Sequence, residues 1–249
     1  MGKLSKTKAN EKYVVEIVTD YDALSDRCKE FDLVKSNNEV QEITLKLKNT
    51  IRANKDILGL SANQIGYSKR ILCLNFNGDI RTFVNPIITN ASTLELSRET
   101  CHSIPDKTFI RTRHSKISVT YQTPLGKIES VDLVGVAAKV FQHHLDHLDG
   151  LLLNDVSLQI DEDFDNATDE ERQEVIDMYL DSLDLTRKQI ETEIENDPEA
   201  KQMSEAVKFI SSVQSGETEL EQVDLSDEDI AHIEKLEEEY KQKKDIKVD

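Results

Sequence analysis

The sequence contains no apolar run long enough to cross a bilayer, and its first ten residues lack the pattern of a secretory signal peptide. Lys6 occupies the position where an N-myristoylation signal has serine or threonine. Cysteine is scarce, because the chain has only Cys28, Cys73 and Cys101. An odd, sparse set suits reduced thiols or a metal ligand better than a disulfide framework. These absences predict a cytoplasmic protein that does not contact membranes.

Positive charge is scarce in the last third of the chain. Residues 160–249 hold 30 acidic and 10 basic side chains, a balance of −20, whereas residues 1–159 hold 19 and 21, a balance of +2. An acidic segment is repelled by phosphates, so we expect no nucleic-acid partner. The composition changes near residues 161–163. We therefore predict one domain at residues 1–159 and an acidic helical extension at residues 160–249.

Hydrophobic periodicity predicts mixed secondary structure in the first domain. Apolar residues three and four positions apart indicate a helix over residues 37–55. Alternating or short apolar runs predict strands at residues 70–75, 81–84, 117–121 and 128–133. We expect Asn85-Pro86 to end the second of these strands. An apolar stretch at residues 133–141 predicts a buried helix after the strands, so the fold class is α+β.

The acidic extension shows three amphipathic segments rather than a uniform polar tail. Thr168, Asp197 and Ser226 are the predicted starts of three helices, and each start is followed by acidic residues or a proline. A run of charge is usually a solvated face. The apolar lines of these helices must nevertheless pack on the domain, on each other or on a protein partner.

The chain is organised around Phe141–Gly150, which contains His143 and His147. On a helix, a spacing of four residues places both imidazoles on one face, where they can bind one metal ion. A zincin motif would have glutamate directly after the first histidine, as the base that acts on water. This sequence has His144 there.

A catalytic metal needs a third protein ligand and an open position. Cys101, in the stretch Glu99–Pro105, is the best candidate, and a thiolate would make the site softer than a third imidazole. An ordinary buried thiol is the alternative interpretation. The fold would have to bring Cys101 to the histidine pair across about forty residues.

Three segments in fixed order resemble the peptide deformylase family. That family has a Gly-x-Gly-Leu-Ala-Ala-x-Gln loop, then Glu-Gly-Cys-Leu-Ser, then Gln-His-Glu-x-Asp-His-Leu-x-Gly. The counterparts here are residues 57–64, 99–103 and 142–150. The likeness covers roughly residues 16–156, and the ordered trio is specific although each motif alone is weak.

The resemblance implies a peptide-deformylase-like α+β fold with a buried metal-binding helix. It also implies one divalent ion held by Cys101, His143 and His147, Fe²⁺ by family likeness, with Zn²⁺ or Ni²⁺ as substitutes. The implied reaction is removal of the formyl group from the N-terminal methionine of a nascent chain. Gln64 and the backbone N–H of residue 102 would hold the developing oxyanion. Gln64, His102, Gly59 and Ile57 would form the wall of the site.

Several residues depart from the family pattern. His144 replaces the glutamate that moves protons in the family. An imidazole can shuttle protons near neutral pH, but a nearby dication disfavours the protonated form that the leaving amine needs. Ile57 and Thr100 replace glycines, and His102 replaces leucine.

Two functions therefore stay open. In the first, the chain is a metal-dependent deformylase that uses His144 as its acid–base group. In the second, which these substitutions favour slightly, it is a non-catalytic deformylase-like binding or assembly protein whose helical tail engages another protein. Deformylase relatives are carried by phages, so the second role would suit a bacteriophage assembly factor acting in the host cytoplasm.

Overall fold

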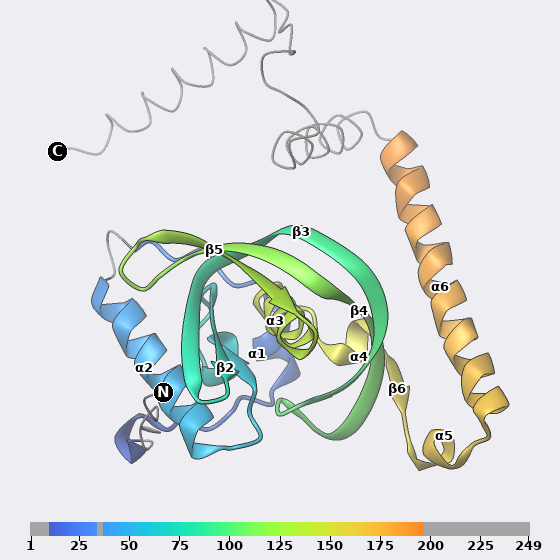
Figure 1. The fold of residues 1–249 in the computed structure, drawn as a ribbon, viewed down its shortest axis with the longest axis horizontal. Coiled ribbons are helices and arrows are strands. Elements are labelled where there is room, and N and C mark those ends of the chain that lie inside the picture. The colour runs from blue at the N-terminus through green and yellow to red at the C-terminus, as the bar shows by residue number, and fades with distance from the viewer. Residues whose placement is uncertain (1–9, 34–36, 197–249) are drawn as a thin grey trace, which may run out of the picture. The chain divides into compact units, whose positions relative to one another are not determined.

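The computed structural model describes residues 10–33 and 37–196 (Figure 1). The chain divides into two units, residues 1–179 and 180–249. The domain predicted from composition ended at residue 159, whereas the first unit extends to Tyr179. The last described strand ends at Ile160, so residues 161–179 are helical and loop residues that follow the sheet. Among the described residues, no helix is long and apolar enough to span a membrane.

Six strands and several helices make up the described chain, and their order is that of an α+β fold. The helices are η1 (Glu11–Tyr13), α1 (Tyr21–Ser25), α2 (Asn37–Ala53), η2 (Asn63–Ile65), α3 (Val136–Leu148), α4 (Leu153–Val156), α5 (Glu162–Asn166) and α6 (Asp169–Asn196). The strands are β1 (Gly59–Ser61), β2 (Ile71–Phe76), β3 (Asp79–Cys101), β4 (Ile104–Gln122), β5 (Ile128–Val134) and β6 (Leu158–Ile160).

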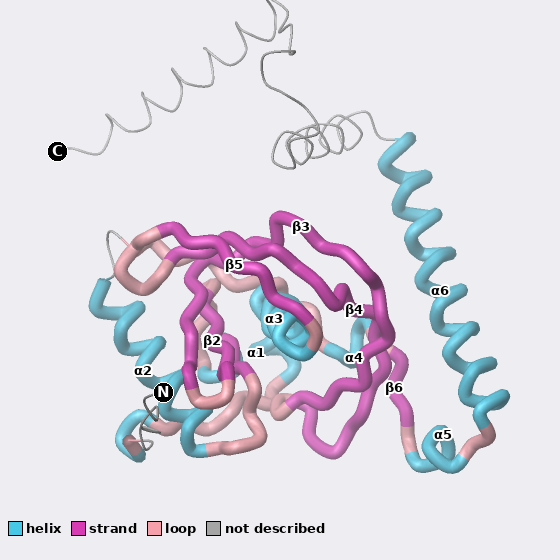
Figure 2. The backbone as a smooth tube through the Cα atoms, viewed as in Figure 1, coloured by secondary structure: helices cyan, strands magenta, loops and turns pink. Residues whose placement is uncertain are grey.

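The sheet is antiparallel throughout. Its strand order is β1-β2-β3-β4-β5, and β6 pairs with β4. Figure 2 shows the strands curving around α3, which lies inside the bend of the long β3–β4 hairpin. The buried helix that the sequence predicted is therefore the centre of the fold.

Strand β2 separates two apolar cores because both of its faces are buried. Ile71 and Cys73 pack in a cluster with the apolar line of α2, whereas Leu72 and Leu74 pack with α3. A strand that helices cover on both faces has a continuous run of apolar residues in its sequence, not an alternation of apolar and polar residues. Burial on both sides fixes the register, since a one-residue slip would exchange the two cores.

The prediction that Asn85-Pro86 ends a strand is wrong. Strand β3 continues through Pro86 to Cys101, and the ladder with β4 shifts register between Val84 and Ile87. Proline lacks an N–H, so it is tolerated within a sheet where a bulge interrupts the pairing. The side-chain amide of Asn85 bonds to both the N–H and the carbonyl of Phe31 and so holds the N-terminal segment against the bulge.

The tight end of the β3–β4 hairpin positions the cysteine. Cys101 is the last residue of β3, and only His102 and Ser103 separate it from β4. The last paired residues are Cys101 and Ile104. The turn therefore fixes the place of Cys101 at the end of the hairpin, and its buried side chain lies 3.2 Å from His147 of α3.

The first helix predicted in the tail is confirmed. α6 begins at Asp169, and Thr168 caps it: the Glu171 N–H donates to Thr168 Oγ1 while the Thr168 N–H donates to Glu171 Oε2. This reciprocal arrangement satisfies two backbone donors at the helix start. The helices predicted to begin at Asp197 and Ser226 lie outside the described residues.

Candidate metal centre and adjoining pocket

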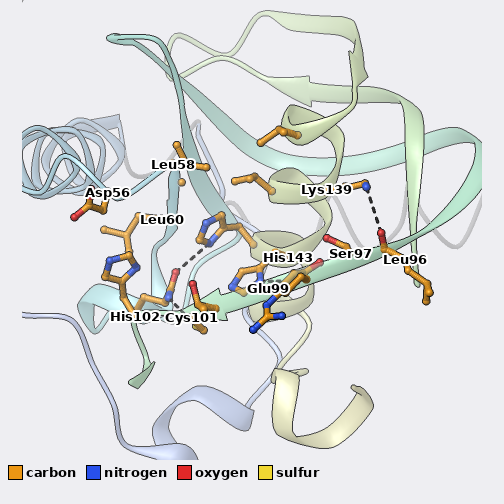
Figure 3. Close-up of a pocket in the computed structure, with 17 residues that line it drawn as sticks. Asp56, Leu58, Leu60, Leu96, Ser97, Glu99, Cys101, His102, Lys139 and His143 are labelled. Carbon is orange, nitrogen blue, oxygen red and sulfur yellow. Dashed lines mark hydrogen bonds and ion pairs between the residues drawn. The ribbon is translucent and has the colours of Figure 1, made fainter. Parts of the chain in front are cut away.

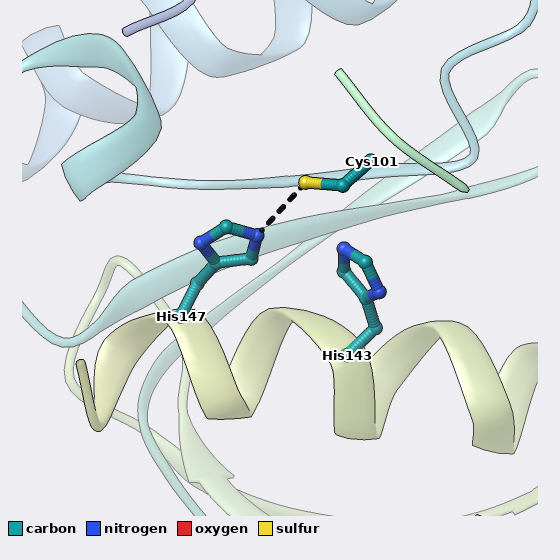
Figure 4. Close-up of side chains that lie close together, drawn as sticks. All are labelled: Cys101, His143 and His147. Atoms are coloured by element: carbon teal, nitrogen blue, oxygen red, sulfur yellow. Dashed lines mark hydrogen bonds between the residues drawn. The ribbon is translucent and has the colours of Figure 1, made fainter. Parts of the chain in front are cut away.

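Three buried side chains that the sequence singled out lie together. Cys101 comes from the end of β3, and His143 and His147 come from one face of α3 (Figure 4). One ligand atom from each lies within 4.8 Å of the other two. The Cys101 Sγ is 3.2 Å from His147 Nε2. The four-residue spacing and the hairpin turn thus bring the cluster together.

A buried carboxylate fixes one of the two rings. His143 Nδ1 is 2.9 Å from Glu99 Oε2, so it donates its proton there and leaves Nε2 free for an ion. Arg113 donates to both oxygens of Glu99, at 2.8 and 2.9 Å. Arg113 also donates to Asp146 of α3 at 2.5 Å. Asp146 therefore supports the cluster through Arg113 rather than by touching a ligand histidine.

Arg113 is a residue of the site that the sequence did not single out. A usable signal was present, since Arg111 and Arg113 share one face of a strand that otherwise carries apolar residues inward. Arginines facing a core are almost always paired with acids. Glu99 and Asp146 were the available partners, and both lay in motifs already identified.

Charge interactions within the cluster shift three pKa values. Burial alone would raise the pKa of Cys101, but hydrogen bonds with His143 and His147 lower it to about 5. Burial would lower the pKa of His143, but Cys101 and Glu99 raise it to about 9. For Glu99, burial is outweighed by Arg113 and His143, which bring the pKa to about 2.

The residues present fit a divalent ion. A thiolate and two imidazoles are the donors that Zn²⁺ and comparable transition metals accept. His147 Nδ1 is buried with no hydrogen-bond partner among the described residues, while its Nε2 faces Cys101. Glu99 supplies the outer carboxylate that metal-binding histidines usually have. The cluster is thus complete as a ligand set.

His144 lies beside the cluster, buried and confined. Its Nδ1 is 3.1 Å from Gln64 Oε1. A Cβ atom added at Gly59 would fall 2.6 Å from His144 Nε2 and 2.4 Å from His144 Cδ2. Position 59 is therefore glycine for a steric reason, because any side chain there would displace the ring. Burial, and then the charges of His143 and His147, hold the pKa of His144 well below its usual value.

The hydrogen bonds of Gln64 define the tautomer of His144. The backbone N–H of Ser61 donates to Gln64 Oε1 at 3.1 Å, and this identifies that atom as the oxygen. His144 Nδ1 must then carry the proton that it shares with Gln64. The Gln64 amide nitrogen donates to Ser103 Oγ at 3.1 Å and lies 3.9 Å from Cys101 Sγ.

A pocket of about 390 Å³ opens beside the cluster. Segments of β3, α3 and the chain before and within β1 line it (Figure 3). Gly59, Gln64 and His102, three of the four predicted wall residues, are among its lining residues. Ile57 is not, because it is buried in the core beside α2. An isoleucine at this position therefore adds to the core instead of crowding the site.

The fold and the cluster together define a class: α+β proteins in which a strand-end cysteine and two histidines of a buried helix form a site suited to one divalent ion. A family model described as "Polypeptide deformylase" matches residues 14–162, more than half of the chain. The chain belongs to the polypeptide deformylase family, whose members depend on a metal.

Relatives and solved structures agree with this assignment. The chain is 41% identical over 99 residues to the peptide deformylase of Treponema pallidum (strain Nichols), covering 39% of this chain and 61% of that protein. It therefore spans less than two thirds of that relative. Identity to the Symbiobacterium thermophilum peptide deformylase is 30% over 155 residues, covering 61% of this chain and 71% of the relative.

Among solved structures, the Thermotoga maritima peptide deformylase superposes with a TM-score of 0.54 at 30% identity, covering 57% of this chain and 97% of that one. The deformylase of Vibrio parahaemolyticus bacteriophage VP16T, solved in complex with actinonin, gives a TM-score of 0.51 at 28% identity, covering 55% and 99%.

Proposed function

We propose that this chain binds one divalent ion through Cys101, His143 and His147 and holds formyl-methionyl polypeptide ends in the adjoining pocket, with little or no hydrolysis. Fe²⁺ is the ion that the family implies, and Zn²⁺ or Ni²⁺ suits the same donors. When bound, such an ion polarises a carbonyl oxygen and lowers the pKa of water. The intact ligand set and the open pocket support binding.

The proposal of little or no hydrolysis rests on the environment of His144. Deformylation ends with a proton given to the leaving amine. His144 stands where the family has its proton-carrying glutamate, but burial and the neighbouring histidines disfavour its charged form. Its Nδ1 proton is engaged by Gln64. A neutral, confined imidazole is thus a poor acid, and the loss of a positioned acid–base group costs about 10²–10⁴-fold in rate.

The alternative function, an active deformylase, depends on the lone pair of His144 Nε2. With the proton on Nδ1, Nε2 can accept a proton from water in the pocket, and an imidazole that does so could later release it. Such an enzyme would need the imidazolium that its surroundings oppose. The two functions differ in what removing or replacing His144 does to turnover.

The test is hydrolysis of a formyl-Met peptide by anaerobically prepared protein carrying one metal ion per chain. Native protein is compared with the His144→Ala and His144→Glu variants, and binding of the peptide is measured for each. We expect native turnover no higher than that of His144→Ala, and at least a roughly 10²-fold gain in His144→Glu. Native turnover that His144→Ala abolishes would instead establish His144 as the proton shuttle.

A protein partner for residues 160–249 and a cytoplasmic location stay predictions from the sequence. The partner hypothesis is tested by comparing the associations of the full chain with those of a chain ending at Asn196, which lacks the second and third predicted helices. An unchanged set of associations would contradict a role for those helices.

A further inference from the structure

One pocket-lining residue, Lys139, ties the two sides of the pocket together. Lys139 lies on α3, one turn before His143, and its stem lines the pocket. Its Nζ is 2.9 Å from Glu95 Oε2 and 3.5 Å from the carbonyl oxygen of Leu96, both on β3. The bridge therefore runs from the helix to the strand. Glu95 itself is not a lining residue.

The bridge lies away from the proposed chemistry. Figure 3 shows Lys139, Leu96 and Ser97 at one end of the pocket, and Asp56 and His102 at the other. Glu95 and the Leu96 carbonyl oxygen hold the ammonium group of Lys139, whose side chain is 22% exposed. Long basic side chains commonly bury their stems in this way while their charged ends stay near water.

We propose that the Lys139–Glu95 bridge determines which first side chains the pocket accepts, by closing its β3 end. This rests on the proposed binding of formylated polypeptide ends. The favoured ligand class is then a formyl peptide whose first side chain is unbranched, apolar and no longer than methionine. In this proposal the first side chain of the peptide points to that end of the pocket, where a longer one would displace the ammonium group from Glu95 and from the Leu96 carbonyl.

The bridge disfavours a longer first side chain but does not exclude it. The side chain of Glu95 is 47% exposed and that of Lys139 is 22% exposed. An ion pair so open to solvent is weak, and opening it changes an affinity by up to about fivefold. Salt screens such a pair, so raising the ionic strength should relax the length limit in native protein.

The experiment compares two formyl tripeptides that differ only in the first residue, methionine or 2-aminooctanoic acid, whose side chain is two atoms longer. Their affinities for zinc-loaded protein are measured by calorimetry in native protein, Lys139→Met, Glu95→Gln and the double variant. Lys127→Met is the matched control, because Lys127 forms a similar 2.8 Å pair with Glu129 without lining the pocket. Zinc content is measured for every variant.

Native protein and Lys127→Met should prefer the methionine peptide. In Lys139→Met the ratio of the two affinities should shift by about fivefold towards the longer chain. Glu95→Gln should shift it in the same direction, and the double variant should shift it no further than Lys139→Met does.

An unchanged ratio in Lys139→Met, with both peptides still bound, would overturn the inference alone. A shift in Lys139→Met without one in Glu95→Gln would also overturn it, since side-chain volume rather than the bridge would be responsible. Failure of zinc-loaded native protein to bind either peptide would overturn the proposed function, and the inference with it.

Discussion

Helix α3 presents two neighbouring histidine environments that differ sharply. Burial alone would lower the pKa of His143, but hydrogen bonds with Cys101 and with Glu99, which Arg113 holds by two hydrogen bonds, raise it to about 9. His144, the next residue, is hydrogen-bonded to the neutral amide of Gln64 and lies against Gly59, and burial followed by the charges of His143 and His147 lowers its pKa. The pKa values of these two adjacent histidines are thus shifted in opposite directions.

The difference between the two histidines separates the groups suited to metal binding from the group that would transfer protons. The His143 side keeps every part of a supported metal ligand, including the outer carboxylate and its arginine. The ring of His144 is hydrogen-bonded to a neutral amide, and the ring centroids of His143 and His147 lie 5.0 and 6.0 Å from its own. In the function that we propose, the metal-binding half of the site is kept while the half that moves protons is replaced.

The largest effect should follow loss of a ligand. Cys101→Ala removes the thiolate, so the metal affinity should fall by more than the roughly 10–100-fold that loss of an outer contact costs. The measurement is metal content after dialysis, with Cys73→Ala as control, because Cys73 is also buried but lies in the core beside α2, away from the cluster. Retention of one ion per chain by Cys101→Ala would contradict the ligand assignment.

The next effect concerns the support of His143. Arg113→Met breaks a buried ion-pair network and leaves Glu99 with only His143 and Asp146 with only Arg111, so the free energy of unfolding should fall by about 3–5 kcal/mol. Urea denaturation measures this change. Arg98→Met, which removes an exposed pair with Asp165, is the control and should leave the denaturation midpoint unchanged. Equal effects of the two variants would show that the Glu99 clamp is unimportant.

A smaller effect is expected on the His144 side. Gly59→Ala places a methyl group against the ring of His144 and should destabilise the fold by about 1–3 kcal/mol. In a His144→Ala background the cost should largely disappear, giving a coupling energy in the range of about 0.5–3 kcal/mol. Additive effects in this double-mutant cycle would mean that the two residues do not touch, although a remaining cost from Leu74 is expected.

The smallest effect tests the bonds of Gln64. Ser61→Ala removes the hydroxyl that lies 2.9 Å from Gln64 Oε1 but keeps the backbone N–H that donates to the same oxygen. The free energy of unfolding should fall by only about 1 kcal/mol. A loss of several kcal/mol would indicate that the hydroxyl, rather than the backbone, orients the amide.

Local pattern predicted the parts of the site that local geometry controls. The spacing of His143 and His147 required only a helix, and the apolar run before them required its burial. The sequence could not predict the contacts of His144, because Gly59 and Gln64 lie about eighty residues before it in the chain. The sequence predicted that a bound dication would disfavour the protonated ring of His144, but it did not reveal that burial would lower the pKa of His144 as well.

The sequence did not predict the full length of the β3–β4 hairpin, and the reason is physical. Residues 89–96 of β3 are mostly small or polar and are not buried, so no alternation of apolar residues marks them as a strand. Their pairing comes from the ladder with β4, which runs almost unbroken from Asn90 to Glu99. Strand propensity depends on such neighbours, which a single sequence does not display.

The most direct test of this account is the protonation state of His144 in zinc-loaded protein, measured by nitrogen NMR of its ring with His144→Gln to assign the signals. Between about pH 5 and 8, where an ordinary histidine titrates, we predict a neutral ring with its proton on Nδ1 throughout. An imidazolium in this range, or a proton on Nε2, would contradict the claim that His144 is confined as a neutral contact and would restore it as a candidate acid.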